Sequence, residues 1–304
     1  MTIAYLGPPG TFTEQALHTQ TDLLDQPTIP MRTFVDILHA TRDGEVDQGF
    51  VAIENAIEGP VNVTLDTLAF DTDLLIQREV VLDIRMQLMA QPGTTLEEIK
   101  VVASHPVANA QCRTFLRSHL PDATVEPANS TADAARIAAE RPGVAALGPQ
   151  NAGDKYGLEI VAEDIADHKG NQTRFLLVTR TGVPAPSGHD KTTVVLTQRH
   201  DHPGSLVAIL QEFAARNINL SKLTSRPVKK NLGDYCFIID LEGHIANDVV
   251  ADCLKNIRAK HAEVKFLGSY PAAGNGSDES RFRSTEAWKE ASNWMDSIRS
   301  QVGD

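Results

Sequence analysis

The sequence predicts an α/β protein made of a two-lobed domain of the periplasmic-binding-protein type, followed by a smaller domain with the ferredoxin-like order βαββαβ. Strand-like and helix-like segments alternate through about the first 180 of 304 residues, which is typical of largely parallel sheets. A segment rich in Gly and Pro, residues 181–191, separates them from a second run of strands and helices. A chain of this length can form two domains that each bury a core.

The first domain is expected over residues 2–180. Its predicted strands are Ile3–Leu6, Gln48–Ile53, Glu79–Leu88, Lys100–Ala103, Val144–Leu147 and Thr173–Val178. Its predicted helices are Thr13–Thr21, Phe34–Asp43, Asn109–Ser118 and Thr131–Glu140. The strand after residues 76–78 is long enough to pass from one lobe to the other, and the last strand can pass back. Crossings near 76–80 and 170–178 predict a cleft between two lobes.

The second domain is expected over residues 192–270. Apolar residues at a 3.6-residue period predict one helix after Pro203 and another around Val250–Ile257. Strands are predicted at residues 192–197, 218–225, 235–241 and 264–268. Helices on one side of such a sheet leave its other face or an edge free, which predicts self-association as a homodimer or homotetramer.

Residues 271–304 are predicted to form a flexible linker and a C-terminal helix. In the helix predicted over 285–301, Trp288, Ala291, Met295 and Ile298 form one apolar stripe. Packing against the chain itself or a partner subunit explains this stripe better than a ligand does.

Composition predicts a cytoplasmic protein without a metal or cofactor. The net charge is −12 and no block of Lys and Arg occurs, which argues against nucleic acid and anionic membranes as partners. Met1 leads directly into a strand, without a signal peptide, and no apolar run approaches the roughly 20 residues that cross a bilayer. The three cysteines form no CxxC pair or metal-ligand cluster.

Polar clusters at strand ends are the candidate ligand-binding groups. Residues 171–175 offer amides, a hydroxyl, a guanidinium and a ring at the start of a strand, and Glu54 and Asn55 follow another strand. The turn at residues 7–13 exposes backbone amides before a helix. Each cluster also has a structural interpretation, in which Thr11 or Thr13 caps a helix, Glu54 and Asn55 cap the next one, and Arg174 forms a salt bridge.

Other reaction classes find no support in the sequence. His105 follows a strand and could act as a general base, but a His-Pro turn before a helix is more often structural. No Ser-His-Asp arrangement, close acidic pair at strand ends or lysine in an apolar helix occurs, so nucleophilic, glycosidic and Schiff-base chemistry lack support.

The motifs taken together resemble the prephenate dehydratase family. They are Gly7-Pro8-Pro9-Gly10-Thr11-Phe12, Ile53-Glu54-Asn55 with Glu58-Gly59-Pro60-Val61, Ser104-His105-Pro106, Tyr156-Gly157-Leu158 and Asn171-Gln172-Thr173-Arg174-Phe175. The second domain resembles the ACT regulatory domain of that family through Gly204-Ser205-Leu206 and Thr224-Ser225-Arg226-Pro227. The resemblance covers about residues 2–270 and is specific because the motifs occur jointly and in order.

The resemblance implies decarboxylating dehydration of prephenate to phenylpyruvate, on the route to phenylalanine. Thr173 would be the catalytic hydroxyl that assists the departing hydroxide. Arg174 would anchor a carboxylate or pair with Glu54, Phe175 would line the site, and Thr11 and Asn55 would bind substrate oxygens.

The resemblance also implies allosteric regulation by L-phenylalanine, bound at an interface between ACT domains. The effector-binding residues would be Gly204, Ser205, Leu206, Asn219, Leu220, Thr224, Ser225, Arg226 and Pro227. Glycine at 204 would let the backbone approach the amino acid closely.

Two positions depart from the family pattern, and two other functions remain open. Ala56 stands where Ser or Thr usually follows Ile-Glu-Asn, and Thr224 stands where the effector motif usually begins with Glu. Arogenate dehydratase differs only in an amino group on the substrate, and kinetics with both substrates distinguishes it. A non-enzymatic amino-acid sensor is the second alternative, which an assay for phenylpyruvate tests.

Overall fold

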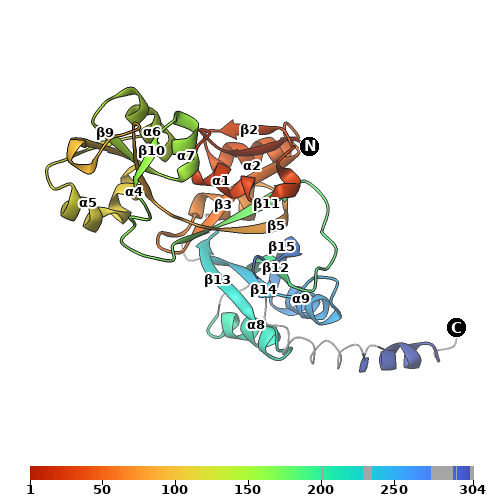
Figure 1. Ribbon diagram of the computed structural model, residues 1–304. Helices are drawn as coiled ribbons and strands as arrows, with labels where there is room; N and C mark the ends of the chain where they lie inside the picture. The colour runs from red at the N-terminus through yellow and green to blue at the C-terminus, as the bar shows by residue number, and fades with distance from the viewer. Residues whose placement is uncertain (200–201, 229–234, 275–289, 292, 302–304) are drawn as a thin grey trace. The chain divides into compact units, whose positions relative to one another are not determined.

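A computed structural model describes residues 1–199, 202–228, 235–274, 290–291 and 293–301. The chain divides into two compact units (Figure 1). The first unit contains residues 1–68 and 80–180, and the second contains residues 69–79 and 181–304. Strand β5 (Leu75–Asp83) therefore begins in the second unit and ends in the first.

One sheet of the first unit has the strand order β2-β1-β3-β11-β5, and β4 pairs with β3. Its other strands are β1 (Ile3–Leu6), β2 (Thr28–Met31), β3 (Gln48–Asn55), β4 (Gly59–Pro60) and β11 (Gln172–Thr179). Strand β1 is parallel to β2 and β3, whereas β11 is antiparallel to β3. Its helices are α1 (Phe12–His18), α2 (Phe34–Asp43) and α3 (Asn62–Asp66).

The other sheet of the first unit has the order β10-β6-β9-β7-β8. Its strands are β6 (Gln87–Ala90), β7 (Val101–Ser104), β8 (Thr124–Pro127), β9 (Val144–Gly148) and β10 (Glu159–Ala162). Its helices are α4 (Pro106–Gln111), α5 (Arg113–His119), α6 (Thr131–Glu140) and α7 (Gln150–Tyr156). The chain thus enters this sheet between residues 83 and 87 and leaves it between 162 and 172.

Several elements of the first unit have the bounds that the sequence predicted, and two predicted elements are each two elements in the structure. The first strand and the helices α2 and α6 match the predicted bounds. The long strand predicted over 79–88 is two strands, β5 and β6, so the first crossing lies a few residues beyond 76–80. The helix predicted over 109–118 is also two, α4 and α5, which meet at Cys112.

Local capping explains why the matched helices begin and end where they do. The Thr33 hydroxyl accepts a hydrogen bond from the Asp36 amide at 3.0 Å, and α2 ends at Gly44, whose φ of 82° suits glycine. The Ser130 hydroxyl likewise accepts from the Asp133 amide at 3.0 Å at the start of α6. These signals are local and can be read from sequence.

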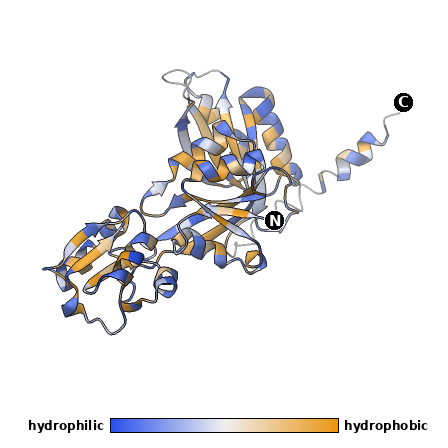
Figure 2. Cartoon of the chain, turned by 90° about the horizontal axis from the view of Figure 1, so that it is seen from above, coloured by the Kyte–Doolittle hydropathy of each residue, from blue (hydrophilic) through white to orange (hydrophobic). Residues whose placement is uncertain are grey.

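The second unit contains the predicted βαββαβ order in a sheet β13-β14-β12-β15. Its elements are β12 (Asp190–Gln198), α8 (Ser205–Ala214), β13 (Leu220–Pro227), β14 (Tyr235–Glu242), α9 (Asp248–Lys260) and β15 (Ala262–Pro271). The strands carry much of the hydrophobic colour, and the helices alternate between hydrophobic and hydrophilic residues (Figure 2). The predicted apolar residues Ile209, Phe213, Val250, Cys253, Leu254 and Ile257 all lie in its core.

Residues 69–79 add a buried ion pair to the second unit. The Glu79 side chain is 1% exposed and accepts from the Lys191 Nζ at 2.8 and 3.0 Å. The Ala273 amide donates to the same carboxylate at 2.8 Å. The predicted boundary at residue 180 did not include this contribution from the earlier part of the chain.

The C-terminal tail is described in part. Residues 293–299 are helical, and Trp294, Met295 and Ile298 are exposed. The flexible segment expected over 271–280 and the beginning of the expected helix, including Trp288, extend outside the described residues.

Candidate active site

The pairing of β3 with β11 brings together two motifs that lie more than 100 residues apart. In the antiparallel register Thr173 lies opposite Asn55, and Arg174 lies opposite Glu54. The register shifts between Arg174 and Phe175, so the alternation of side chains changes at this point. The two strand-end clusters predicted from sequence therefore form one site.

The Asn55 side chain contacts the Thr173 hydroxyl directly. Its Nδ2 lies 2.9 Å from Thr173 Oγ1 and 2.8 Å from Asn171 Oδ1, with Gln172 O more distant at 3.2 Å. Its Oδ1 accepts from the amides of Ile57 at 3.0 Å and Glu58 at 2.9 Å. Because both hydrogens and the oxygen of the carboxamide have partners within the protein, Asn55 orients Thr173 rather than presenting a free donor to substrate.

Arg174 and Glu54 form an ion pair beside Thr173. Arg174 Nη1 lies 3.9 Å from Glu54 Oε2, and the Arg174 side chain is 12% exposed. The structural interpretation of Arg174 as a paired residue is therefore observed. A guanidinium that is largely buried remains charged, so the residue that follows Thr173 on β11 carries a fixed positive charge.

Phe175 supports the site from the core. Its ring stacks on Phe50 with centroids 5.3 Å apart and an interplanar angle of 8°, and the residue is 1% exposed. This position fixes the strand that carries Thr173, whereas the sequence predicted that the ring lines the site itself.

Thr11 caps helix α1, as one of the two interpretations of its turn predicted. Its hydroxyl donates to Leu6 O at 3.0 Å and accepts from the Glu14 amide at 3.4 Å. The Glu14 carboxylate accepts from Tyr5 Oη at 2.8 Å and from the Gly10 amide at 2.6 Å, which ties the turn to the first strand. Burial, together with the Glu14 carboxylate, raises the pKa of the Tyr5 hydroxyl, so Tyr5 remains a donor to Glu14.

Gln111 reaches the site from the other sheet, and the sequence assigned it no role. It ends helix α4 and is 7% exposed. Its Nε2 donates to Glu58 Oε1 at 3.1 Å, and its Oε1 accepts from Asn171 Nδ2 at 3.2 Å. The sequence offered one signal of a role for Gln111, which is its position in the helix that follows the Ser104-His105-Pro106 turn. His105 is the N-cap of the same helix without a capping bond from its side chain.

The effector residues expected in the second unit lie at the two ends of helix α8 and, for Thr224 to Pro227, along strand β13. Gly204 precedes helix α8 with a φ of 90°, and the Ser205 hydroxyl accepts from Gln198 Nε2 at 2.7 Å. Asn219 and Leu220 follow the other end of α8. A helix of 10 residues is about 15 Å long, so Gly204 and Asn219 of one chain lie too far apart to bind the same amino acid.

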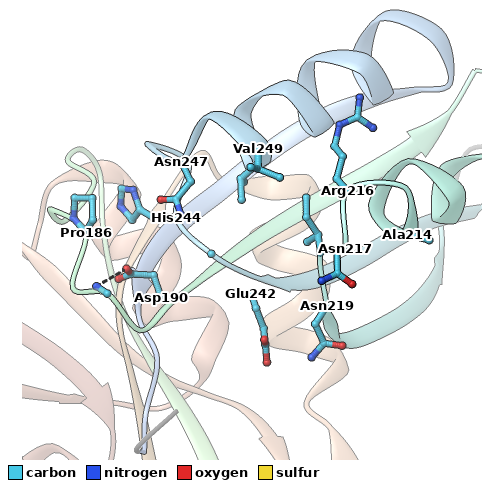
Figure 3. Close-up of a pocket in the computed structure, with 14 residues that line it drawn as sticks. Pro186, Asp190, Ala214, Arg216, Asn217, Asn219, Glu242, His244, Asn247 and Val249 are labelled. Carbon is cyan, nitrogen blue, oxygen red and sulfur yellow. Dashed lines mark hydrogen bonds between the residues drawn. The ribbon is translucent and has the colours of Figure 1, made fainter. Parts of the chain in front are cut away.

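Two cavities in the second unit border the two ends of α8 separately. Asn219 lines a cavity of about 570 Å³ together with Asp190, Glu242, His244 and other residues (Figure 3). Ser205 lines a different cavity of about 410 Å³, with Arg199 and His261. The cavities therefore place Ser205 and Asn219 at different sites on one chain.

Metal and membrane features can be judged within the described ranges. There, no group of three or more His, Cys, Asp and Glu side chains is arranged to hold a metal ion. Likewise, none of the described helices is long and apolar enough to span a bilayer.

The fold and site define a small-molecule enzyme with a two-sheet α/β catalytic unit and a regulatory domain of the ACT type. The sequence profile of the prephenate dehydratase family matches residues 3–182, and the ACT domain profile matches residues 193–259. The chain belongs to the prephenate dehydratase family, and it is a lyase.

Individual relatives agree with this assignment over most of the chain. The prephenate dehydratase of Mycobacterium tuberculosis is 41% identical over 280 residues, covering 88% of this chain and 86% of the relative. That of Mycolicibacterium vanbaalenii is 42% identical over 283 residues, covering 88% and 90%. The crystal structure of the Arthrobacter aurescens enzyme in complex with L-Phe is 40% identical, with a TM-score of 0.88 over 99% of this chain and 100% of that one.

Proposed function

We propose that Thr173 is the catalytic group of this prephenate dehydratase, donating a hydrogen bond to the 4-hydroxyl as it leaves. The ring carboxylate leaves as carbon dioxide, and the electron pair of its C–C bond enters the ring. The C–O bond to the 4-hydroxyl breaks, and the departing hydroxide takes a proton to become water. Because hydroxide is a poor leaving group, a donor at that oxygen lowers the barrier.

The contact between Asn55 Nδ2 and Thr173 Oγ1 carries this assignment. An amide nitrogen has no lone pair to share, so the Thr173 oxygen accepts and its own proton remains to donate elsewhere. A threonine hydroxyl is a very weak acid, and it therefore serves as a hydrogen-bond donor within a proton relay. Arg174, held beside Glu54, supplies the positive charge that anchors a substrate carboxylate.

Three other residues that the sequence predicted to contact substrate have more limited roles in this proposal. Thr11 Oγ1 uses its proton on Leu6 O, so it meets substrate only as an acceptor. Phe175 acts from the core, and Asn55 acts through Thr173.

Replacing the Thr173 hydroxyl tests the proposal. Thr173→Val keeps the branched shape on strand β11 and removes only the donor, while Thr173→Ser keeps the donor. We expect kcat for phenylpyruvate formation to fall at least about 10²- to 10³-fold in the valine variant, as for loss of a transition-state donor, with KM little changed. The serine variant should retain much of the turnover. Wild-type kcat in Thr173→Val would overturn the assignment.

We also propose that L-phenylalanine regulates the enzyme by binding between the ACT domains of two subunits. The Arthrobacter aurescens relative was crystallised with L-Phe. Gly204–Leu206 and Asn219–Leu220 lie at opposite ends of α8, so one ligand contacts both groups when they come from two chains. The remaining effector residues, Thr224, Ser225, Arg226 and Pro227, lie on β13.

Sedimentation and activity with added phenylalanine test the regulatory proposal. A homodimer or homotetramer whose sedimentation coefficient or activity changes with phenylalanine is expected, because an effector acts by binding one of two states better. No change in either measurement would contradict it. Rates with prephenate and arogenate then establish the preferred substrate, and we propose prephenate.

We propose a cytoplasmic location for the enzyme. Cys112, Cys236 and Cys253 are free thiols and buried, which suits a reducing compartment. Fractionation of expressing cells tests this location. Activity found in a non-cytoplasmic fraction would contradict it.

A further inference from the structure

Three carboxamides connect the catalytic strand to the second sheet through a continuous chain of hydrogen bonds. Asn55 Nδ2 donates to Asn171 Oδ1 at 2.8 Å, Asn171 Nδ2 donates to Gln111 Oε1 at 3.2 Å, and Gln111 Nε2 donates to Glu58 Oε1 at 3.1 Å. The amide of Glu58 in turn donates to Asn55 Oδ1, so the chain of bonds returns to the turn where it began.

The direction of this chain follows from its two ends. At one end Asn55 Oδ1 receives two backbone N–H groups, which only an oxygen can do, so its NH₂ must face Asn171 and Thr173. At the other end a carboxylate accepts and does not donate, so the NH₂ of Gln111 must face Glu58. Asn171 in the middle then has one arrangement only, with its oxygen toward Asn55 and its NH₂ toward Gln111.

Burial keeps the middle of the chain from reversing. Asn171 is 3% exposed and Gln111 is 7% exposed, so water does not replace a bond lost by rotation of either amide. Their backbones are also fixed, because Asn171 O accepts from the Ile84 amide at 2.8 Å and Gln111 O accepts from the Asp167 amide at 2.7 Å.

We infer that Asn171 and Gln111 are positioning residues that hold the Thr173 hydroxyl as a donor. This inference rests on the proposed role of Thr173. The Asn171 oxygen takes one hydrogen of Asn55 and fixes the carboxamide plane, so the other hydrogen points at Thr173 Oγ1. The Thr173 proton is thereby directed away from Asn55. Since Gln111 belongs to α4 of the other sheet, the direction of this hydroxyl depends on both sheets of the catalytic unit.

The variant Asn171→Asp breaks the direction of the chain with almost no change in shape. The new carboxylate still accepts from Asn55, but it cannot donate to Gln111 Oε1. We expect kcat to fall by about 10- to 100-fold, the cost of a misplaced catalytic group, with a smaller change in KM. A circular dichroism spectrum like that of the wild type and a cooperative melting transition will show that the fold is intact, although the buried charge should lower the melting temperature.

A second substitution should restore the chain of hydrogen bonds with the direction of the bonds at Gln111 reversed. In Asn171→Asp with Glu58→Gln, the Gln111 amide turns over, donates to the new carboxylate and accepts from the new amide at 58. We expect the double variant to recover at least about half of the lost activation free energy, and the Glu58→Gln single variant to lose less activity than Asn171→Asp. A merely structural role of Asn171 does not predict this recovery.

The control separates hydrogen-bond direction from charge. Asp83 is exposed and accepts from Gln172 Nε2 at 2.8 Å, outside the chain. Asp83→Asn removes the same charge as Glu58→Gln, so it should not restore activity to Asn171→Asp. Equal recovery in the two double variants, or wild-type kcat in Asn171→Asp, would overturn the inference.

Two further results keep the test decisive. Should Asn171→Asp fail to fold, Gln111→Glu places two carboxylates face to face, and Glu58→Gln is again expected to restore kcat; no recovery there would overturn the inference. An inactive Thr173→Val beside a fully active Asn171→Asp would refute the positioning role alone. A fully active Thr173→Val would instead refute the proposed function of Thr173.

Discussion

Removing the ammonium group of Lys191 should destabilise the second unit strongly, because it takes away the cation that contacts both oxygens of the buried Glu79 carboxylate. The Glu79 side chain is 1% exposed, and both of its oxygens lie within 3.0 Å of Lys191 Nζ. Breaking one partner of a buried ion pair costs about 3–5 kcal/mol. Lys191 is 22% exposed and Glu79 keeps the Ala273 amide as a donor, so we expect Lys191→Met to cost about 3 kcal/mol.

Urea unfolding followed by circular dichroism measures this cost. With a slope of about 2–3 kcal/mol per molar urea, the midpoint of the transition that reports the second unit should fall by about 1–1.5 M. The double variant Lys191→Met, Glu79→Gln also removes the buried negative charge and should recover most of the loss. Lys265→Met is a suitable control, since Lys265 Nζ donates to the neutral backbone carbonyls of Ala69 and Thr72, and its carboxylate partner Asp73, 3.4 Å away, is fully exposed. Its loss should therefore cost less.

The reasoning about the pair would be refuted by either of two results. A loss below about 1 kcal/mol in Lys191→Met would mean that water or a rearranged partner satisfies the carboxylate. A double variant as unstable as Lys191→Met would mean that lost packing, and not the buried negative charge, dominates the cost.

Two further predictions concern the core and the buried thiols. Phe175→Ala removes a ring stacked on Phe50 and should cost about 3–5 kcal/mol in calorimetry or urea unfolding, more than Phe115→Ala, whose ring stacks on His119 near the surface; equal costs would contradict it. Burial raises the pKa of Cys112 and Cys253 to about 12, so both thiols should resist a thiol reagent at pH 8 until the protein unfolds. Because the unfolded thiols ionise near pH 9 and the folded ones do not, the free energy of unfolding should fall between about pH 9 and 12, and rising stability in that range would refute the assignment.

Local sequence signals were sufficient for many elements. Helices α2 and α6 have their predicted bounds because Thr33, Ser130 and Gly44 act on adjacent backbone groups. The two helices of the βαββαβ order in the second unit also follow from period alone, since their apolar residues fall on one helix face.

Three short strands whose own sequences carry no strand pattern were not predicted. Strands β2, β8 and β10 are short, and most of their residues are exposed or half-buried, so no apolar alternation marks them. They are strands because β1, β7 and β6 supply hydrogen-bonding partners. The division of residues 79–88 into β5 and β6 likewise follows from their pairing in two different sheets.

The sequence by itself predicted which residues of this prephenate dehydratase take part in the chemistry, through the order of its motifs. It could not determine their hydrogen-bond partners, because pairing between β3 and β11 and the approach of α4 are long-range contacts. Only the tertiary structure placed the Thr173 hydroxyl against the side-chain nitrogen of Asn55. The backbone amides of Ile57 and Glu58 both donate to the other end of that side chain, which identifies that end as the oxygen. The physical reason is that a hydroxyl can donate or accept, and its neighbours in space, not in sequence, decide which it does.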